Sequence, residues 1–283
     1  MTWGTRRRKF LSSLFVAFCA ASVLIALVPL AFVLFFVVSQ GIQSLNIAFF
    51  THMPVPTGEQ GGGMLNSIVG SLILVGLGGL FAIPIGILSG IYMSEYAGTR
   101  LASLVRFAAD TLNGVPSIVV GVFVYGIAVL PFRQFSAIAG GLALGIMMIP
   151  IIARTTEELL LLVPGTMREG ALALGATHAR AVFTVVVPSA AQGIITGIVL
   201  AIARIAGETA PLLFTALNNR FFTTKLTQPI SSLTVQVYTY AQSPYVDQHR
   251  QAWAGALVLV VIVLTCSLLA RFATRRLEGL TSR

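Results

Sequence analysis

The chain has 283 residues, of which 56% are hydrophobic and only 10% are charged. Soluble domains carry about 25% charged residues, so this composition excludes a water-soluble globular protein and places the chain in the membrane class. The net charge of +9 would suggest a nucleic-acid partner in a soluble protein. Here the cations lie mainly at the ends of apolar runs, where they set membrane topology instead.

Long apolar runs predict about six transmembrane helices, because each run is long enough as a helix to cross a hydrocarbon layer of roughly 30 Å. The runs are too long and too uniform for barrel strands. We therefore expect an all-α, polytopic helical bundle that forms a single transmembrane domain over residues 1–283. The predicted spans cover residues 11–39, 65–93, 101–131, 136–162, 189–217 and 252–274.

Most of the 18 lysines and arginines fall on the cytoplasmic side if the N-terminus is cytoplasmic. The exceptions are four residues of the outer loops and one inside a span: Arg133, Arg220, Lys225, Arg250 and the intramembrane Arg204. The positive-inside rule then predicts a multi-pass membrane protein with both termini in the cytoplasm.

Two outer segments join the predicted spans. Residues 40–64 contain Pro54, Pro56 and a run of three glycines, which predicts an irregular turn. Residues 231–238 are mildly amphipathic and predict a short helix lying at the outer surface. Within the spans, the Gly86–Gly90 and Gly141–Gly145 spacings are typical of small-residue helix packing.

Residues 163–188 form a cytoplasmic segment with two predicted short helices. Thr166 and Glu169 have the spacing of a capping box, which predicts a helix start at this point. Gly175 is expected to end that helix in a left-handed conformation, and a second helix is expected from Ala176 to Pro188. By physics alone, an ordinary hairpin between two spans explains the segment as well as a functional element does.

Arg204 and Glu208 lie four residues apart in the fifth span and therefore share one helical face. An arginine near the bilayer centre costs about 2.5 to 3.5 kcal/mol, so it is expected to face a cavity or a partner. One interpretation is a self-neutralising pair that stabilises the bundle. The other is an anion path, in which the guanidinium binds phosphate oxygens. Glu208 would then accept a hydrogen bond from the protonated oxygen of hydrogen phosphate, and it would repel fully ionised sulfate.

Further polar residues surround this pair in the sequence. Thr209 is expected to line the same path, and Pro211 predicts a kink that leaves the carbonyl of Gly207 unpaired. In the third span, Asn113 and Ser117 either face the pore or join helices by hydrogen bonds. Arg106 and Asp110 are four residues apart, and we interpret them as a neutralising pair.

The cytoplasmic segment resembles the EAA loop of bacterial ABC importer permeases. The resemblance rests on Glu169-Gly170-Ala171, on Gly175 six positions after Glu169, and on the ending Val185-Val186-Val187-Pro188; Gly170 stands where the family has alanine. Within these permeases, the chain is most similar to the phosphate-specific subunits of the PstA type. That resemblance is best over residues 64–216 and is carried by residues 93–96, 113–121, 154–158, 168–177 and 203–213.

This resemblance implies a type I ABC importer permease-like fold, a place in the bacterial cytoplasmic (inner) membrane and the import of inorganic phosphate. It implies four kinds of partner: a homologous second permease, a dimeric ATP-binding subunit, an extracytoplasmic phosphate-binding protein and the lipid bilayer. The residues that couple the chain to the ATPase would be Glu169, Gly170, Ala171, Gly175 and Pro188. The chain has no G-x-x-x-x-G-K-[ST] sequence, so we expect no enzyme activity and no cofactor in this chain, with ATP and Mg²⁺ bound by the partner ATPase.

Two other functions stay open at this point. The same architecture could import another oxyanion, such as molybdate or sulfate, or a polar organic solute. Alternatively, the chain could be an autonomous channel or an ion-coupled carrier in which Arg204 and Glu208 form a gate.

Overall fold

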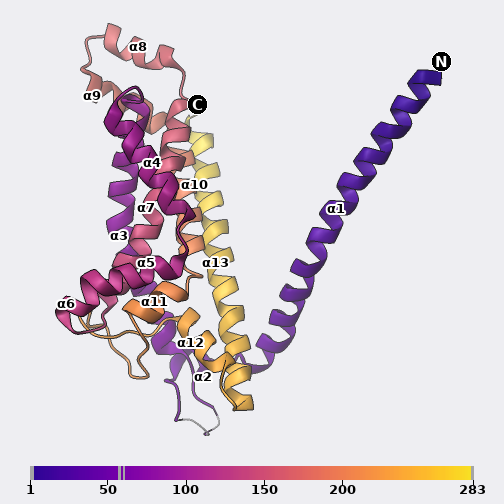
Figure 1. Cartoon of the computed structure of the whole chain (residues 1–283), viewed down its shortest axis with the longest axis vertical. Helices are drawn as coiled ribbons and strands as arrows, with labels where there is room; N and C mark the ends of the chain where they lie inside the picture. Colours follow the sequence, from indigo (N-terminus) through magenta and orange to yellow (C-terminus); the bar gives the residue numbers. More distant parts are fainter. Residues whose placement is uncertain (1–2, 57–58, 60, 282–283) are drawn as a thin grey trace.

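The computed structural model describes residues 3–56, 59 and 61–281, with the side chains of residues 8–56, 59 and 61–268. This part of the chain contains helices and loops but no strand. The helices in chain order are α1 (Trp3–Gly41), α2 (Ile47–Thr51), α3 (Leu65–Glu95), α4 (Arg100–Gly114), α5 (Ser117–Val124), α6 (Leu130–Phe132), α7 (Ala137–Leu161), α8 (Gly165–Ala173), α9 (His178–Ala181), α10 (Val187–Ile205), α11 (Ala210–Thr215), α12 (Leu233–Ala241) and α13 (Val246–Thr281), with the 3₁₀ turn η1 (Ile42–Ser44) and the π-helical turns η2 (Tyr125–Val129) and η3 (Val182–Val186) (Figure 1).

The all-α membrane bundle is confirmed. Among the described residues, five helical stretches are long and apolar enough to cross a membrane. The bent pair that begins with α4 and α5 would be a sixth span if its two parts are counted as one. The first, second, fourth and sixth predicted spans are the single helices α1, α3, α7 and α13. Figure 1 shows α8 and α9 at one end of the bundle and α2 and α12 at the other.

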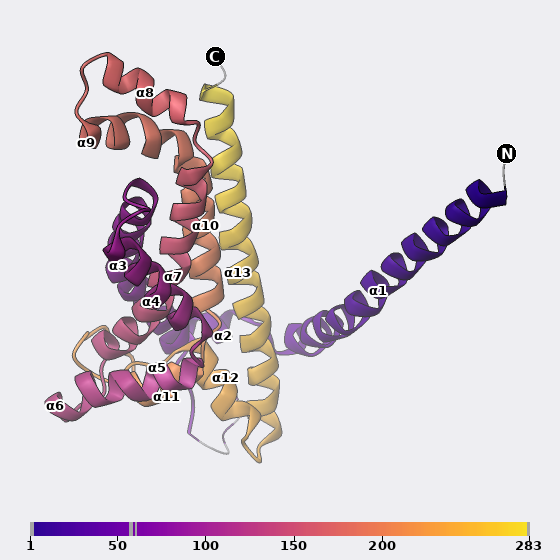
Figure 2. The same cartoon turned by 45° about the horizontal axis from the view of Figure 1, so that its top comes forward.

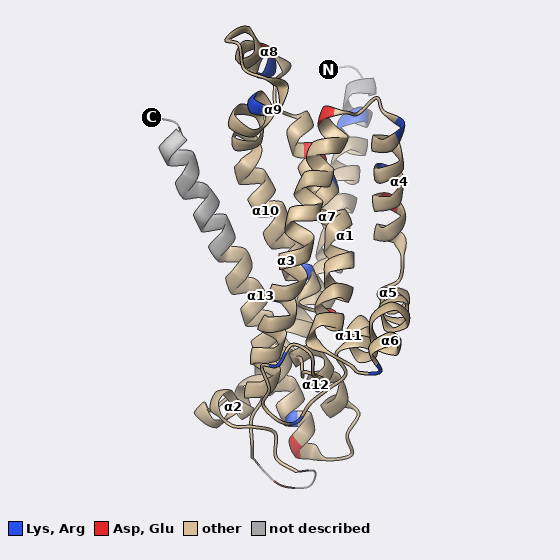
Figure 3. Ribbon diagram, turned by 90° about the vertical axis from the view of Figure 1, so that its left-hand side faces the viewer, with Lys and Arg blue, Asp and Glu red and all other residues tan. Residues whose placement is uncertain are grey.

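Charged residues follow this division into two ends. In Figure 3 the coloured lysines, arginines and acidic residues gather toward the α8–α9 end and toward the loops at the opposite end, with few between them. The first turns of α1 and the last turns of α13 both lie toward the α8–α9 end (Figure 1). Most of the terminal arginines behind the topology prediction, Arg6, Arg7, Arg271, Arg275, Arg276 and Arg283, lie outside the described side chains.

The core is built on the contact between α3 and α7, where small residues let the two backbones approach. A methyl group on Gly86 would lie 2.8 Å from the side chain of Ile152, and one on Gly90 would lie 2.5 Å from that of Thr156. On α7, a methyl group on Gly141 would lie 2.5 Å from Leu77. The predicted small-residue packing is therefore confirmed on both helices, and it fixes α3 and α7 as one rigid pair.

Helix α1 leaves this bundle. It contacts the bundle mainly at its C-terminal end, where the backbone of Gly41 lies against Trp253 and Leu257 of α13, and then diverges from the other helices (Figures 1 and 2). Almost all of its described apolar side chains are exposed. Because α1 has so little contact with its own chain, its apolar surface is left for lipid or another subunit.

The third and fifth predicted spans are wrong as continuous helices. The third divides into α4 and the segment from α5 to α6, which are bent by 107° at Val115-Pro116. The fifth divides into α10 and α11, separated by residues 206–209. The outer segment 231–238 does form a helix, α12, at the end of the bundle opposite α8 and α9. Its Leu233, Val235 and Gln236 are buried against the bundle, while Tyr238 is exposed.

Candidate functional site

The two broken spans meet where α5 packs on α11 (Figure 2). A methyl group on Gly121 would lie 2.7 Å from the Cα atom of Pro211, so the two backbones are in direct contact. Ser117 lies one helical turn before Gly121, and Thr209 lies two residues before Pro211. The structure therefore brings the predicted path residues of the third and fifth spans toward one region.

The break between α4 and α5 follows from Pro116. A proline disfavours the helical conformation of the residue before it, and Val115 is accordingly extended, with φ −72° and ψ 130°. Asn113 is exposed at the end of α4, and Ser117 is half-buried at the start of α5. Both residues therefore lie directly beside the break.

The break between α10 and α11 follows from Pro211, which lies in the first turn of α11, where a missing amide hydrogen is harmless. The predicted kink is thus a complete interruption of the helix. The backbone carbonyl of Glu208, inside the interruption, accepts a hydrogen bond of 2.9 Å from the hydroxyl of Thr234 on α12. A helix from the outer end of the bundle is therefore hydrogen-bonded to the break.

Arg204 lies in the last turn of α10 and its residue is exposed, while Glu208 is half-buried in the break. No ion pair joins the two side chains, although ion pairs do form elsewhere in the described part of the chain. The self-neutralising interpretation is therefore not what this structure contains. The C-terminal end of a helix carries partial negative charge, which favours a cation such as the Arg204 guanidinium at this position.

A second charged cluster joins α4 to α7. The side chain of Glu157 is 2% exposed and accepts hydrogen bonds from Arg106 Nε at 2.8 Å and from Arg154 Nη1 at 2.6 Å. Arg154 Nε lies 3.0 Å from Asp110 Oδ1. The predicted Arg106–Asp110 pair is wrong, because the buried carboxylate of Glu157 needs cationic partners more than the half-exposed Asp110 does.

Sequence reasoning missed Glu157 as the centre of this cluster. Arg154 and Glu157 are three residues apart, a spacing that already places them on one face of α7. That signal was available in the sequence. The contact with Arg106 was not, since it depends on how α4 packs against α7.

The cytoplasmic segment contains the two short helices, α8 and α9, which lie side by side in Figure 2. The capping-box prediction is wrong. Helix α8 begins at Gly165 because the amide of Met167 already bonds to the carbonyl of Pro164, so Thr166 lies inside the first turn and caps nothing.

The predicted end of α8 at Gly175 is confirmed. Gly175 has φ +82°, a left-handed conformation that glycine adopts without strain. The amide of Ala176 bonds to the carbonyl of Ala171 at 3.1 Å, and that of Gly175 to the carbonyl of Leu172 at 2.9 Å. This pair of bonds is a Schellman motif, which fixes the direction in which the chain leaves α8.

The second short helix begins later than predicted and continues further. It starts at His178, after Thr177 accepts a hydrogen bond from the amide of Arg180 at 3.3 Å. It then passes through η3 into α10, with Pro188 in the first turn of α10. Pro188 therefore marks the start of a membrane helix and not the end of the short one.

Three of the predicted coupling residues, Glu169, Gly170 and Ala171, lie on α8, Gly175 lies in the turn that follows it, and Pro188 lies in the first turn of α10. Glu169, Gly170 and Gly175 are exposed, and Ala171 is half-buried. Leu174, which sequence reasoning missed, is 91% exposed in the turn after α8. An apolar residue directly before a helix-ending glycine was the signal that could have found it.

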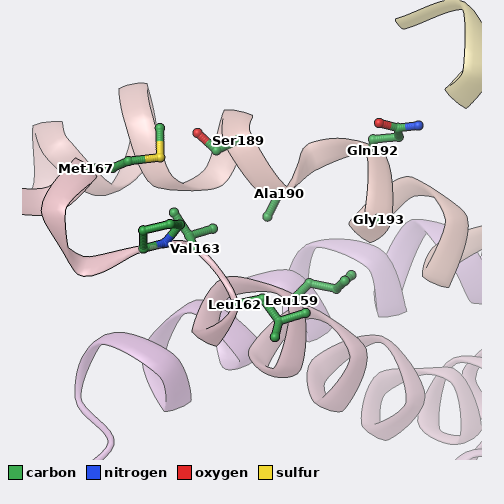
Figure 4. Close-up of a pocket in the computed structure, with 9 residues that line it drawn as sticks. Leu159, Leu162, Val163, Met167, Ser189, Ala190, Gln192 and Gly193 are labelled. Carbon is green, nitrogen blue, oxygen red and sulfur yellow. The ribbon is translucent and has the colours of Figure 1, made fainter. Parts of the chain in front are cut away.

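Below α8, a groove of about 360 Å³ is lined by the end of α7, the start of α8 and the start of α10. Figure 4 shows Leu159, Leu162 and Val163 on one side of it, and Ser189, Ala190 and Gln192 on the other. Its walls are mainly apolar. The groove leaves α8 and α10 separated on this side, so α8 is not fixed to α10 by packing there.

These features define a polytopic helical membrane protein with broken spans at one contact and two short helices projecting at one end. Residues 82–283 match the family model of the binding-protein-dependent transport system inner membrane component. The chain is 43% identical to the Haemophilus influenzae phosphate transport system permease protein PstA, over 93% of this chain and 94% of the relative. It is 45% identical to the Yersinia pestis protein of the same name, over 89% and 85%.

The fold has solved counterparts. It is similar to a chain in the crystal structure of a bacterial alginate ABC transporter bound to its periplasmic protein, with a TM-score of 0.68 over 97% of both chains at 15% identity. The chain belongs to the binding-protein-dependent transport system inner membrane components and, within them, to the PstA permeases.

Proposed function

We propose that the chain is the permease subunit of an ATP-driven importer that moves inorganic phosphate across the cytoplasmic membrane. The observation that carries this proposal is identity above 40%, over most of both chains, with proteins named as phosphate transport permeases. The structure supports it with an exposed intramembrane guanidinium and with two short helices that project at one end.

In this proposal, the solute passes the region where α5 and α11 meet. Arg204 binds the anion through its guanidinium, which matches two phosphate oxygens at once. Glu208, with no cation paired to it in the described part of the chain, accepts a hydrogen bond from the protonated oxygen of hydrogen phosphate. Sulfate carries no such proton near neutral pH and is repelled. Thr209, Asn113 and Ser117 line the approach on either side of the two breaks.

The short helices α8 and α9 transmit ATPase motion in this proposal. Glu169, Gly170, Ala171, Gly175 and Pro188 are the coupling residues, and the exposed Leu174 side chain inserts into the ATPase surface. Burying one leucine stabilises such a contact by about 1.5 to 3 kcal/mol. Hydrolysis of ATP with Mg²⁺ takes place in the partner, and this chain binds neither.

The assembly contains a homologous second permease, a dimeric ATP-binding subunit and an extracytoplasmic phosphate-binding protein. The exposed apolar surface of α1 faces lipid and the second permease. The first turns of α1 and the last turns of α13 lie toward the α8–α9 end, and in this proposal that end is cytoplasmic, because the ATPase acts from the cytoplasm.

The proposal is tested by reconstituting the complete complex in vesicles and measuring uptake of radioactive phosphate. We expect uptake that requires ATP and the binding protein, and that excess sulfate or molybdate does not inhibit. Inhibition by sulfate would contradict the role of Glu208 and favour another oxyanion. Solute flux through the purified chain alone, without ATP, would instead support a channel or carrier.

A further inference from the structure

A buried carboxylate at the end of α3 contacts both short helices of the coupling segment. The side chain of Glu95 is 4% exposed. Its Oε1 atom accepts hydrogen bonds from Arg168 of α8, at 2.9 Å from Nη2 and 3.1 Å from Nε. Its Oε2 atom lies 3.5 Å from Nε2 of His178, the first residue of α9. One carboxylate at the end of a core helix therefore hydrogen-bonds to α8 and contacts the first residue of α9.

The guanidinium of Arg168 also joins α8 to α7. Its Nη1 atom donates to the carbonyl of Val163 at 3.0 Å, and its Nη2 atom donates to the carbonyl of Leu160 at 3.0 Å. Leu160 lies in the last turn of α7 and Val163 lies two residues beyond its end, so Arg168 binds both the carbonyl end of this helix and the turn that follows it. Its charge also interacts favourably with that helix end.

Packing alone does not explain the position of α8. No residue of α8 is buried, and the groove described above separates its start from α10 on one side. Buried apolar contact is the usual reason that a short helix keeps its place. For α8, the described contacts that reach the ends of α3 and α7 are instead polar and pass through Arg168.

We propose that Glu95 is a positioning residue that transmits movement of the coupling helices to the rigid α3–α7 pair. This inference rests on the proposed function, because it assumes that an ATPase moves α8 and α9. The covalent chain from α9 through η3 leads into α10, and Val182 and Val186 of η3 also pack in one apolar cluster with Ile91 of α3 and Leu160 of α7. The Glu95–Arg168 contact adds a second connection to α3 and α7, so that both parts of the membrane domain move together.

Glu95 lies far along the chain from the coupling segment, 73 residues before Arg168. Because its side chain is also buried, its substitution changes no exposed side chain of α8 or α9. This separates its role from that of residues that touch the ATPase. A loss of coupling in a Glu95 variant must then arise inside the permease.

The test compares Glu95→Gln with Glu95→Asp and with Glu158→Gln in the complete complex, with phosphate uptake and ATP hydrolysis measured in the same vesicles. Glu158 is a matched control because it is an exposed carboxylate near the same end of α7. We expect Glu95→Gln to lower the phosphate moved per ATP hydrolysed at least tenfold, with ATP hydrolysis changed less than twofold. Glu95→Asp should restore part of the ratio, and Glu158→Gln should match the wild type.

A second readout does not depend on the cargo. Hydrogen exchange of the full-length chain should be at least tenfold faster at residues 165–178 in Glu95→Gln than in the wild type or Glu158→Gln. An unchanged ratio of uptake to hydrolysis in Glu95→Gln would overturn the inference, even if exchange is faster, because the residue would then be only a structural contact. Unchanged exchange would overturn it as well.

Failure of the proposed function gives a different pattern. If the wild-type complex moves no phosphate, the cargo assignment fails for every variant alike. The exchange comparison then still decides whether Glu95 holds the coupling helices, and the ratio is measured with whichever solute the wild type transports.

Discussion

Gly121 and Pro211 lie in backbone contact between α5 and α11, so closely that a methyl group on Gly121 would be 2.7 Å from the Cα atom of Pro211. This contact joins the two broken spans, and no flexible side chain is available to give way. The arrangement of the proposed path therefore depends on the absence of a Cβ atom at Gly121.

We predict that Gly121→Ala lowers both thermal stability and phosphate uptake, because an overpacked contact typically costs about 1 to 3 kcal/mol. Gly126→Ala is the matched control on the same segment, since a methyl group on Gly126 meets no heavy atom within 4 Å. Melting temperature and uptake are measured on both purified variants in the complex. Equal behaviour of the two variants would show that the α5–α11 contact is not tight in the working protein.

Two glycines of the coupling segment should respond in opposite ways. Gly175→Ala forces a left-handed conformation on alanine, which costs about 1 to 2 kcal/mol and alters the exit from α8. Gly170→Ala lies inside the helix, where alanine is favoured by about 1 kcal/mol. Neither added methyl group meets another atom within 4 Å.

We therefore expect less phosphate moved per ATP in Gly175→Ala, and wild-type or better coupling in Gly170→Ala. The measurement is the ratio of uptake to hydrolysis in vesicles. If Gly175→Ala couples as well as Gly170→Ala does, the Schellman motif has no part in coupling.

Leu174 should contribute directly to ATPase binding. Because its exposed side chain becomes buried in the proposed complex, Leu174→Ser should weaken the affinity for the ATP-binding subunit about tenfold or more. Phe132→Ser serves as the control, since this residue is 78% exposed at the opposite end of the bundle. Affinity is measured with the purified subunits, and equal affinities for the two variants would place Leu174 outside the interface.

Much of the fold could be predicted from the sequence, because the hydrocarbon layer requires long apolar helices and hydropathy reports them directly. The breaks within the third and fifth spans were not predicted. Pro116 and Pro211 were both visible, but a proline inside a membrane helix produces either a kink or an interruption, depending on what packs beside it. Here α11 packs on α5, and the hydroxyl of Thr234 bonds to the break.

The charged residues show the same limit. Four-residue spacing on one helix suggested the Arg106–Asp110 pair, whereas the structure pairs both residues with α7. A local rule identifies which charges can meet along one helix. It gives no information on a better partner that folding brings from another helix.

Gly175 was predicted correctly for a related reason. Its left-handed conformation depends on the local backbone of α8 and not on distant packing. The coupling segment was thus recognisable from its own residues, while its attachment to Glu95 required the tertiary structure.

The central claim is that Arg204 binds the transported phosphate, and phosphate uptake by the reconstituted Arg204→Ala complex tests it most directly. Arg100→Ala is the control, because Arg100 is an exposed arginine at the start of α4. Hydrogen bonds to charged groups contribute about 1.5 to 3 kcal/mol, so we predict that phosphate uptake falls about tenfold or more in Arg204→Ala. Assembly and basal ATP hydrolysis should stay intact in this variant, and phosphate uptake should stay normal in Arg100→Ala. Normal phosphate uptake by Arg204→Ala would contradict the account.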